Sequence, residues 1–528
     1  QTEITIPSKI NFKQIVEIGD EAFYNNYKLK SVYLPNSIKH IGNSAFYGCS
    51  QIESIVLPDS VLSIGDRAFK DCRNLKTLVM GVNANNVGTD AFKNCEIEDA
   101  IVPSTAVRFL DEEKLISLEI LGSTISGIDF DEFENLEKLV LNEGIRSIPY
   151  QAFAQCRNLK EVVIPNSVTT VTTNAFGNCR IEKATMPNIW LKYFPKTYLR
   201  EIVITNGDSL DDSAFSNNAF NLERVVLPNG MTSIGNYAFS RCQKLKNVTL
   251  PSTLTTIGDY AFYGCTSLKQ LDIPQSVKYI GDNAFEDSGI EEIELPDNVT
   301  SLGDNVFSSC DNLKSVVLGK GIKKIGQRTF YNCSNLESIS MSDEVTEIGD
   351  YAFYYCIKLK NINLPTNLTA IGNYAFSNCE SLAGIAIPNN LQMINQNVFS
   401  DCYQLKSVKF GTSLKTIGYN AFEGCRSLTE LNFEHVESIG NTSFFDCDGL
   451  LKVTLSSNVK TIGYNAFFGC DGAIFYCEST SKPDNWNNSW MAEDYAVIWD
   501  YKNNTTPGYL HLNGVKYTLN HNDKTAVI

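Results

Sequence analysis

The sequence predicts an α/β-type repeat solenoid with a continuous ladder of short strands, about 19 coils and few regular helices. Two observations lead to this fold class. An Ala-Phe pair or a close relative recurs along the whole chain, and a segment of alternating apolar residues, often ended by proline, follows most copies. A unit repeated in this way cannot bury its apolar side chains alone, so neighbouring units must stack to form a core.

The period of the repeat is 23 residues in most copies. When the phenylalanine of the Ala-Phe pair is taken as the anchor of each coil, 13 of the 18 intervals between successive anchors are 23 residues long. The long intervals, before Phe130 and Phe215, each hold one extra, shorter coil. The anchors are Phe23, Phe46, Phe69, Phe92, Phe130, Phe153, Phe176, Phe215, Phe239, Phe262, Phe285, Phe307, Phe330, Phe353, Phe376, Phe399, Phe422, Phe444 and Phe467.

Each position of the repeat suits one structural role. In residues 245–251, LKNVTLP, Val248 and Leu250 lie on one face of a predicted strand and Thr249 on the other, because side chains alternate along a strand. Pro251 has no N–H to donate and ends the strand. We expect Gly258 to occupy a tight or positive-φ turn, and the anchor Phe262 to fill the interior opposite the strand.

The segments I-G-x-x-A-F-x-x-C and L-x-x-V-x-L-P resemble the BspA-like leucine-rich-repeat family over about residues 15–471. The resemblance implies a leucine-rich-repeat superhelix. It also implies a non-enzymatic protein that is secreted or located at the cell surface. Its implied partner is macromolecular, a host matrix protein or a protein on another cell.

The sequence divides into four predicted parts. They are a lead-in strand in residues 1–14, the solenoid in residues 15–471 with irregular blocks near 93–130 and 177–215, a C-terminal cap in residues 472–501, and a linker and hairpin in residues 502–528. Trp486, Trp490 and Trp499 are the expected cover of the last coil, and Asn513-Gly514 is the expected hairpin turn. The first residues show no secretory leader, so either the chain is cytosolic or its leader is missing. Because the chain starts within a repeat, we favour a missing leader. Because the hairpin resembles a lead-in to another array, we expect a continuation after Ile528.

Composition argues against two classes of partner. The chain has 44 Lys and Arg against 60 Asp and Glu, a net charge of −16, which repels phosphate backbones and so disfavours nucleic acid. No apolar run approaches the ~18 residues needed to span a bilayer, so we expect no membrane insertion within this chain.

Fifteen of the 16 cysteines fall three residues after an anchor phenylalanine. Side chains stacked in register point in parallel, which disfavours disulfide geometry, so we expect buried free thiols. A bond between Cys470 and Cys477 is the alternative.

The four histidines lack metal-ligand spacing, and neither GDSLDD nor DCDG continues as a calcium loop. The sequence therefore predicts no catalytic residue, cofactor or metal.

One row of residues is not explained by the scaffold. In the first ten predicted strands the outward residue between the two buried positions is apolar except at Glu119 and Thr185, whereas in the next ten only Val317 and Ala386 are apolar. Strand propensity is one explanation, and an apolar strip that binds a partner is the other. The candidate strip is Tyr33, Val56, Val79, Ile101, Val140, Val163, Val203 and Val226.

Tyrosines also recur beside the anchors. Tyr237, Tyr260, Tyr351 and Tyr374 precede the Ala-Phe pair, and Tyr47, Tyr263, Tyr331 and Tyr354 follow it. They are either contact residues, which interfaces favour, or consensus packing residues.

The function hypothesis is adhesion or protein–protein binding through an extended solenoid face, and the alternative is a structural spacer in the cell envelope that carries another domain.

Overall fold

The structure is a computed structural model that describes residues 2–170, 172–216, 218–492, 495–502, 508–512, 515–520 and 525–527. The chain forms a parallel β-solenoid of about 21 turns with almost no helix, which confirms the predicted fold class. It divides into two compact units. Unit 1 comprises residues 1–207 and 218–228, and unit 2 comprises residues 208–217 and 229–528.

The number of turns exceeds the expected 19 coils because each irregular block adds a coil that has no anchor phenylalanine. Two ladder strands, β11 and β12, lie between Phe92 and Phe130, and two more, β15 and β16, lie between Phe176 and Phe215.

Unit 1 contains a parallel ladder of strands and a second set of two-residue strands. The ladder strands are β1 (Glu3–Thr5), β5 (Ser31–Tyr33), β7 (Ser54–Leu57), β9 (Thr77–Met80), β11 (Asp99–Pro103), β12 (Ser117–Leu121), β13 (Lys138–Leu141), β14 (Glu161–Val163), β15 (Lys183–Met186), β16 (Glu201–Ile204) and β18 (Arg224–Val226). The two-residue strands are β2 (Lys9–Ile10), β3 (Lys13–Gln14), β4 (Glu17–Ile18), β6 (His40–Ile41), β8 (Ser63–Ile64) and β10 (Asn86–Val87). The described helices of this unit are two short 3-10 segments, η1 (Ser104–Phe109) and η2 (Asn188–Trp190).

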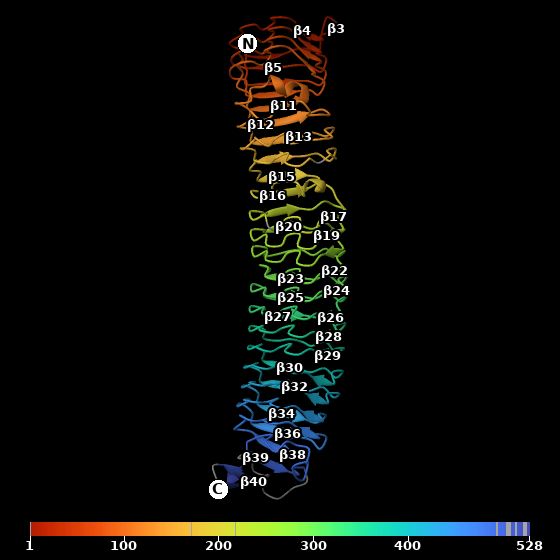
Figure 1. The fold of residues 1–528 in the computed structure, drawn as a ribbon, viewed down its shortest axis with the longest axis vertical. Coiled ribbons are helices and arrows are strands. Elements are labelled where there is room, and N and C mark those ends of the chain that lie inside the picture. Colours follow the sequence, from red (N-terminus) through yellow and green to blue (C-terminus); the bar gives the residue numbers. More distant parts are fainter. Residues whose placement is uncertain are drawn as a thin grey trace. The chain divides into compact units, whose positions relative to one another are not determined.

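Unit 2 repeats this arrangement, and its two sets of strands form two columns in Figure 1. The longer strands are β20 (Asn247–Thr249), β23 (Glu292–Glu294), β25 (Ser315–Val317), β27 (Ser338–Ser340), β30 (Gly384–Ala386), β32 (Ser407–Lys409), β34 (Glu430–Phe433), β36 (Lys452–Leu455), β38 (Ile474–Cys477) and β39 (Ala496–Trp499). The two-residue strands are β17 (Ser209–Leu210), β19 (Ser233–Ile234), β21 (Thr256–Ile257), β22 (Tyr279–Ile280), β24 (Ser301–Leu302), β26 (Lys324–Ile325), β28 (Glu347–Ile348), β29 (Ala370–Ile371), β31 (Met393–Ile394), β33 (Thr416–Ile417), β35 (Ser438–Ile439) and β37 (Thr461–Ile462).

The predicted continuous ladder is interrupted. In unit 1, β1 and β5 form a sheet separate from the one that begins at β7, and unit 2 has two further gaps. Residues 270–273 and 361–364 stand at ladder positions but form no strand. The residues at the centre of these segments are Asp272 and Asn363, two residue types that strands disfavour.

The carboxyl end of unit 2 contains the predicted cap and hairpin segments. Trp490 lies edge-on against Phe467, with 5.9 Å between ring centroids, and Trp486 and Trp490 are buried. Strands β40 (Gly508–Leu512) and β41 (Val515–Asn520) pair antiparallel, and β42 (Thr525–Val527) pairs with β41. The expected turn, Asn513-Gly514, lies outside the described residues. No described helix is long and apolar enough to cross a membrane.

Columns of stacked anchor rings form the interior. In unit 2 the twelve anchors from Phe215 to Phe467 stack in sequence, with centroids 5.0–5.6 Å apart and ring planes within 17° of parallel. In unit 1 the stack from Phe23 to Phe92 is separate from the stack that ends at Phe176, where Trp190 packs edge-on at 6.2 Å. The coil spacing therefore sets the separation of the core side chains.

The repeated glycine has a different role from the one predicted. Gly258 has no positive φ, which lies instead at the residue two before nearly every anchor, such as Tyr260 with φ 54°; Phe130 is the exception. A Cβ on Gly258 would meet the backbone N of Asn236 at 2.8 Å. The glycine is needed because the backbones of neighbouring coils approach each other closely at this point.

A ladder of Asp and Asn side chains next to these glycines was not predicted. The side-chain oxygen at this position accepts a hydrogen bond from the backbone N–H of the equivalent residue in the next coil, as from Asn43 to Asp20 at 2.6 Å and from Asp66 to Asn43 at 2.9 Å. Unit 2 repeats it from Asp282 to Asp259 at 2.9 Å. The ladder satisfies backbone donors that the two-residue strands leave unpaired.

The cysteines are all buried and free, Cys470 and Cys477 included. Each of the 15 column thiols donates to the carbonyl oxygen of the anchor phenylalanine in the preceding coil, at 3.0–3.7 Å. Burial raises the pKa of Cys49 to about 11 and the pKa of Cys265 well above the ordinary range. The column therefore holds neighbouring coils together as thiols.

The glycine column predicts a contrast between two neighbouring positions. A Cβ at Gly42 would meet the backbone N of Asp20 at 2.5 Å, whereas one at Gly19 would meet nothing within 4 Å. We expect Gly42→Ala to lower the free energy of unfolding by ~1–3 kcal/mol through overpacking, and Gly19→Ala to be neutral or slightly stabilising. Urea denaturation followed by circular dichroism checks this, and equal effects of the two variants would contradict it.

The thiol column predicts a protected set of cysteines. Because the thiolate is the reactive form and burial raises the thiol pKa, we expect the folded chain to resist iodoacetamide at pH 8. All 16 cysteines should be alkylated once the chain is unfolded without reductant, as mass spectrometry can count. Rapid labelling of the folded chain, or fewer than 16 labels after unfolding, would contradict the arrangement.

Candidate binding face

The outward residues of unit 1 form a row in strict register across the ladder. Val56 pairs with Val79, Val79 with Ile101, and Ile101 with Glu119. The row continues through the pairs Glu119 with Val140, Val140 with Val163, Val163 with Thr185, Thr185 with Val203 and Val203 with Val226. Directly paired residues on one face have side chains in contact range, so the candidate strip is one contiguous row from Val56 to Val226 with two polar members.

All eight strip residues reach solvent. Tyr33 and Val56 are each 59% exposed and Val203 is 39% exposed, and the other five are half-buried. Their strand neighbours, such as Ile55 and Leu57, point inward and are buried. The strip residues therefore contribute to the outer face of the sheet and not to the core.

A groove of about 820 Å³ lies over the amino-terminal end of the strip. Four strip residues line it, namely Tyr33, Val56, Val79 and Ile101, together with Met80, Leu121 and Pro58. Its polar lining comes from Ser31, Ser54, Ser60, Asn36 and Asp59. This groove has an apolar floor and a single carboxylate, a composition typical of binding sites.

The structure does not bring the other four strip residues into this groove. Val140, Val163, Val203 and Val226 lie farther along the same sheet, beyond Glu119. The Glu119 carboxylate accepts a hydrogen bond from Asn142 Nδ2 at 2.5 Å, which holds it on the row. Glu119 thus separates the groove from the second apolar segment.

A row of alternating charges flanks the second segment, and sequence reasoning missed it. This charge row stands two residues before the outward residues of the ladder strands β13 to β18. Its members, each paired with the next across the ladder, are Lys138, Glu161, Lys183, Glu201 and Arg224. Lys138 and Glu161 form an ion pair of 2.8 Å, and Lys183 and Glu201 one of 3.5 Å. Comparison of this single position in consecutive coils shows the alternation in the sequence itself.

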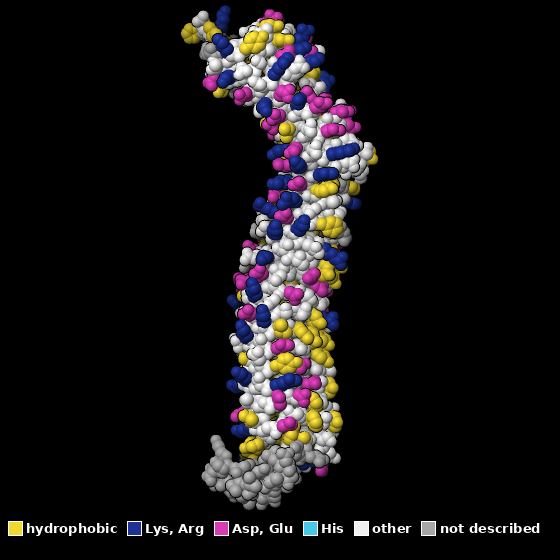
Figure 2. Space-filling model, turned by 90° about the vertical axis from the view of Figure 1, so that its left-hand side faces the viewer, with side chains coloured by type: hydrophobic (Ala, Val, Ile, Leu, Met, Phe, Trp, Pro, Cys, Tyr) yellow, Lys and Arg dark blue, Asp and Glu magenta, His cyan; other side chains and the backbone are white. Residues whose placement is uncertain are grey.

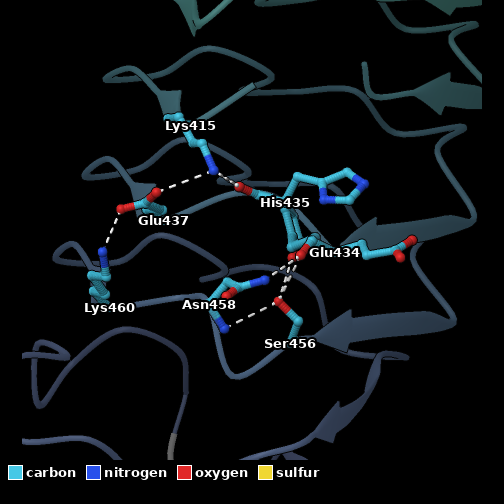
Figure 3. Close-up of polar contacts among 8 residues, drawn as sticks. Lys415, Glu434, His435, Glu437, Ser456, Asn458 and Lys460 are labelled. Carbon is cyan, nitrogen blue, oxygen red and sulfur yellow. Dashed lines mark hydrogen bonds and ion pairs between the residues drawn. The ribbon is translucent and has the colours of Figure 1, made fainter. Parts of the chain in front are cut away.

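Ion pairs between coils recur elsewhere on the surface. Figure 2 shows basic and acidic side chains beside one another along the face that it presents. In unit 2, Glu437 lies between Lys460 at 2.5 Å and Lys415 at 3.1 Å (Figure 3). Hydrogen bonds from the two lysines, the larger effect coming from Lys460 and the smaller from Lys415, lower the pKa of the Glu437 carboxyl. These ion pairs join neighbouring coils and so belong to the scaffold rather than to a binding site.

The same figure places a histidine among such contacts. The backbone oxygen of His435 accepts a hydrogen bond from Lys415 Nζ at 3.4 Å, while Asn458 Nδ2 donates to the backbone oxygen of Glu434 at 2.8 Å (Figure 3). In unit 1, His40 Nδ1 lies 2.7 Å from Ser63 Oγ. Within the described residues no three His, Cys, Asp or Glu side chains are placed to hold a metal ion.

The equivalent row of unit 2 is mostly polar. Thr249, Asp272 and Glu294 stand at the strip position and are exposed, and Val317 is 45% exposed. A groove of about 500 Å³ here is lined by Asp272, Glu292 and Glu294 among others. The two units therefore present different chemistry on the same structural position.

Comparison with known proteins identifies the repeat. A family model for the "BspA type Leucine rich repeat region (6 copies)" matches residues 1–113, 123–246, 208–337, 323–435 and 428–483. No curated protein matches the chain.

Several solved structures resemble the chain. One is a leucine-rich repeat protein from Bacteroides ovatus, 22% identical, with a TM-score of 0.33 over 94% of this chain and 91% of that one. A leucine rich cell surface protein from Faecalibacterium prausnitzii is 23% identical, with a TM-score of 0.27 over 78% and 88% of the two chains. The T. pallidum leucine rich repeat protein is 27% identical, with a TM-score of 0.28 over 38% of this chain and 83% of its own.

The charge row predicts a small, salt-dependent contribution to stability. Glu161→Gln removes the partner of Lys138 on a solvent-exposed face. We expect the free energy of unfolding to fall by less than ~1 kcal/mol, and the difference from wild type to vanish at about 1 M salt, where charges are screened beyond ~3 Å. Urea titrations at two salt concentrations measure this, and a larger or salt-independent loss would indicate a packing role for Glu161.

Proposed function

The chain belongs to the BspA-type leucine-rich-repeat family, and from this we propose that it is a non-enzymatic secreted or cell-surface protein that mediates adhesion through the outer face of unit 1. Leucine-rich-repeat proteins commonly take part in protein–protein interaction and are generally binding proteins without catalysis. The proposed partner is a host matrix protein or a protein on another cell.

The observation that carries the proposal is the registered apolar row whose first members line the groove. Strand propensity alone explains valine on a strand. It does not explain why unit 2 places Thr249, Asp272 and Glu294 at the same position. Since the fold accepts polar residues there, the apolar residues of unit 1 need another reason, and contiguous exposed apolar area is typical of an interface.

The mechanism would be the sum of contacts along the sheet. Each apolar side chain removed from water contributes about 25 cal/mol per Å², so one valine alone binds weakly. The groove collects Tyr33, Val56, Val79 and Ile101 in one place, and several copies of the chain on one cell surface would add avidity.

The polar row of unit 2 favours a second role for that unit. A surface without an apolar strip suits a structural spacer that holds a binding region or another domain away from the cell. The long unbroken stack of anchor rings from Phe215 to Phe467 supports a regular rod-like segment in this unit.

The test is binding to a panel of immobilised matrix and mucosal glycoproteins. The test variant is Val56→Glu with Val79→Glu, which places charge in the groove. The matched control is Val317→Glu with Ala386→Glu, because both residues are apolar and exposed at the same position in unit 2. Circular dichroism verifies that each variant folds.

We expect saturable binding by the wild-type chain and the control, and at least a tenfold loss for the groove variant, since charge would be buried without a partner. Equal binding by all three proteins would remove the groove as the site. A wild-type chain that binds no glycoprotein of the panel would contradict adhesion and favour the spacer role.

A further inference from the structure

A second surface, in unit 2, combines stacked tyrosine rings with carboxylates. Tyr237 and Tyr260 stand two residues before the anchors Phe239 and Phe262, so they occupy the same position in neighbouring coils. Their ring centroids are 4.7 Å apart with planes 4° from parallel, and Tyr263 packs edge-on against Tyr260 at 5.9 Å. Tyr237 is 43% exposed, so the stack is open to a partner.

The backbone does not favour tyrosine at this position. Tyr237 and Tyr260 have φ of 57° and 54°, in the left-handed region that asparagine enters more readily than aromatic residues. Other coils of unit 2 place Asn283, Asn305 and Asn397 here, with φ of 55° or 56°. The scaffold alone therefore gives no reason for two successive tyrosines.

Three carboxylates, those of Asp259, Asp282 and Glu286, lie near Tyr260. Asp259 Oδ1 accepts hydrogen bonds from Tyr279 Oη at 3.4 Å and from the backbone N–H of Asp282 at 2.9 Å. Glu286 accepts one from Asn283 Nδ2 at 2.6 Å. None of these three carboxylates has an ion-pair partner among the described residues. Burial raises the pKa of Tyr260, and the neighbouring Tyr237, Glu286, Asp282 and Asp259 raise it further, so the acids lie within electrostatic reach of the rings.

The chain itself shows which group such tyrosines accept. Arg328 Cζ lies 5.7 Å from the Tyr331 centroid and 5.4 Å from the Tyr351 centroid, where Tyr351 and Tyr374 form an equivalent stack with 4.8 Å between their centroids. Within the described residues, no cation lies over Tyr237 or Tyr260 in this way, although Arg241 lies over Tyr263 at 5.7 Å. A guanidinium over a tyrosine face is a favourable cation–π arrangement.

We propose that Tyr237 and Tyr260, with the carboxylates of Asp259, Asp282 and Glu286, form a binding site for an arginine side chain of a partner protein. A planar guanidinium stacks on an aromatic face and donates to carboxylates at the same time. The net charge of −16 adds long-range attraction for a basic segment. This site is independent of the apolar strip of unit 1.

The test compares two matched double variants. Tyr237→Asn with Tyr260→Asn removes the stack and introduces the residue that other coils already carry at this φ. Tyr351→Asn with Tyr374→Asn is the control, because it removes the equivalent stack beside Arg328. Neither pair changes the net charge, so any difference in affinity is due to the rings.

The probe is a peptide of alternating glycine and arginine, titrated calorimetrically at physiological salt. We expect the wild-type chain and the control to bind it equally, and the Tyr237/Tyr260 variant to bind about fivefold or more weakly. Glu286→Gln keeps both rings and should weaken binding by about twofold. No binding by the wild-type chain, unchanged affinity of the Tyr237/Tyr260 variant, or an equal loss in the control would overturn the proposal.

Discussion

The close approach of one coil to the next is the constraint on which this structure depends. Strands of a parallel ladder lie about 4.8 Å apart, and every other side chain must fit that spacing. The anchor rings do so by stacking face to face, with centroids 5.0 Å apart for Phe23 and Phe46. At Gly42 the backbones come so close that a Cβ would lie 2.5 Å from the preceding coil. A Cβ is therefore excluded from the glycine column at positions such as Gly42.

The same constraint explains the ladders of polar groups. Stacking places identical residues over one another, which is unfavourable for charges unless each has a donor. The ladder of Asp and Asn side chains meets this requirement, because the Asp259 carboxylate accepts a hydrogen bond from the backbone N–H of Asp282. The cysteine column does so through thiol-to-carbonyl bonds such as Cys265 to Phe239 at 3.2 Å. In the charge row of unit 1 the stacked side chains alternate in sign, as in the pair of Lys138 with Glu161. Each ladder makes the register of the coils more specific.

Binding surfaces then arise at the positions that stacking leaves free. The outward strand residue lies on the solvent side of the sheet, and the residue two before the anchor reaches solvent in coils such as that of Tyr237, so both positions accept different residue types. Unit 1 uses the first position for its apolar row, and unit 2 uses the second for the tyrosine stacks. In a solenoid, one substitution per coil changes a whole row, which is how the two units acquire different surfaces on the same scaffold.

The sequence by itself determined the repeat, its period, the inward anchors and the alternation of the strands, because these follow from local periodicity and side-chain volume. It also revealed the extra coil in each irregular block and the outward row from Val56 to Val226. Only the tertiary structure decided why Gly258 is glycine, since its neighbour in space is Asn236 of the preceding coil. It likewise decided that Asp272 and Asn363 interrupt the ladder, and that Tyr33, Val56, Val79 and Ile101 line one groove. These features depend on distances between coils, and a one-dimensional pattern does not contain them.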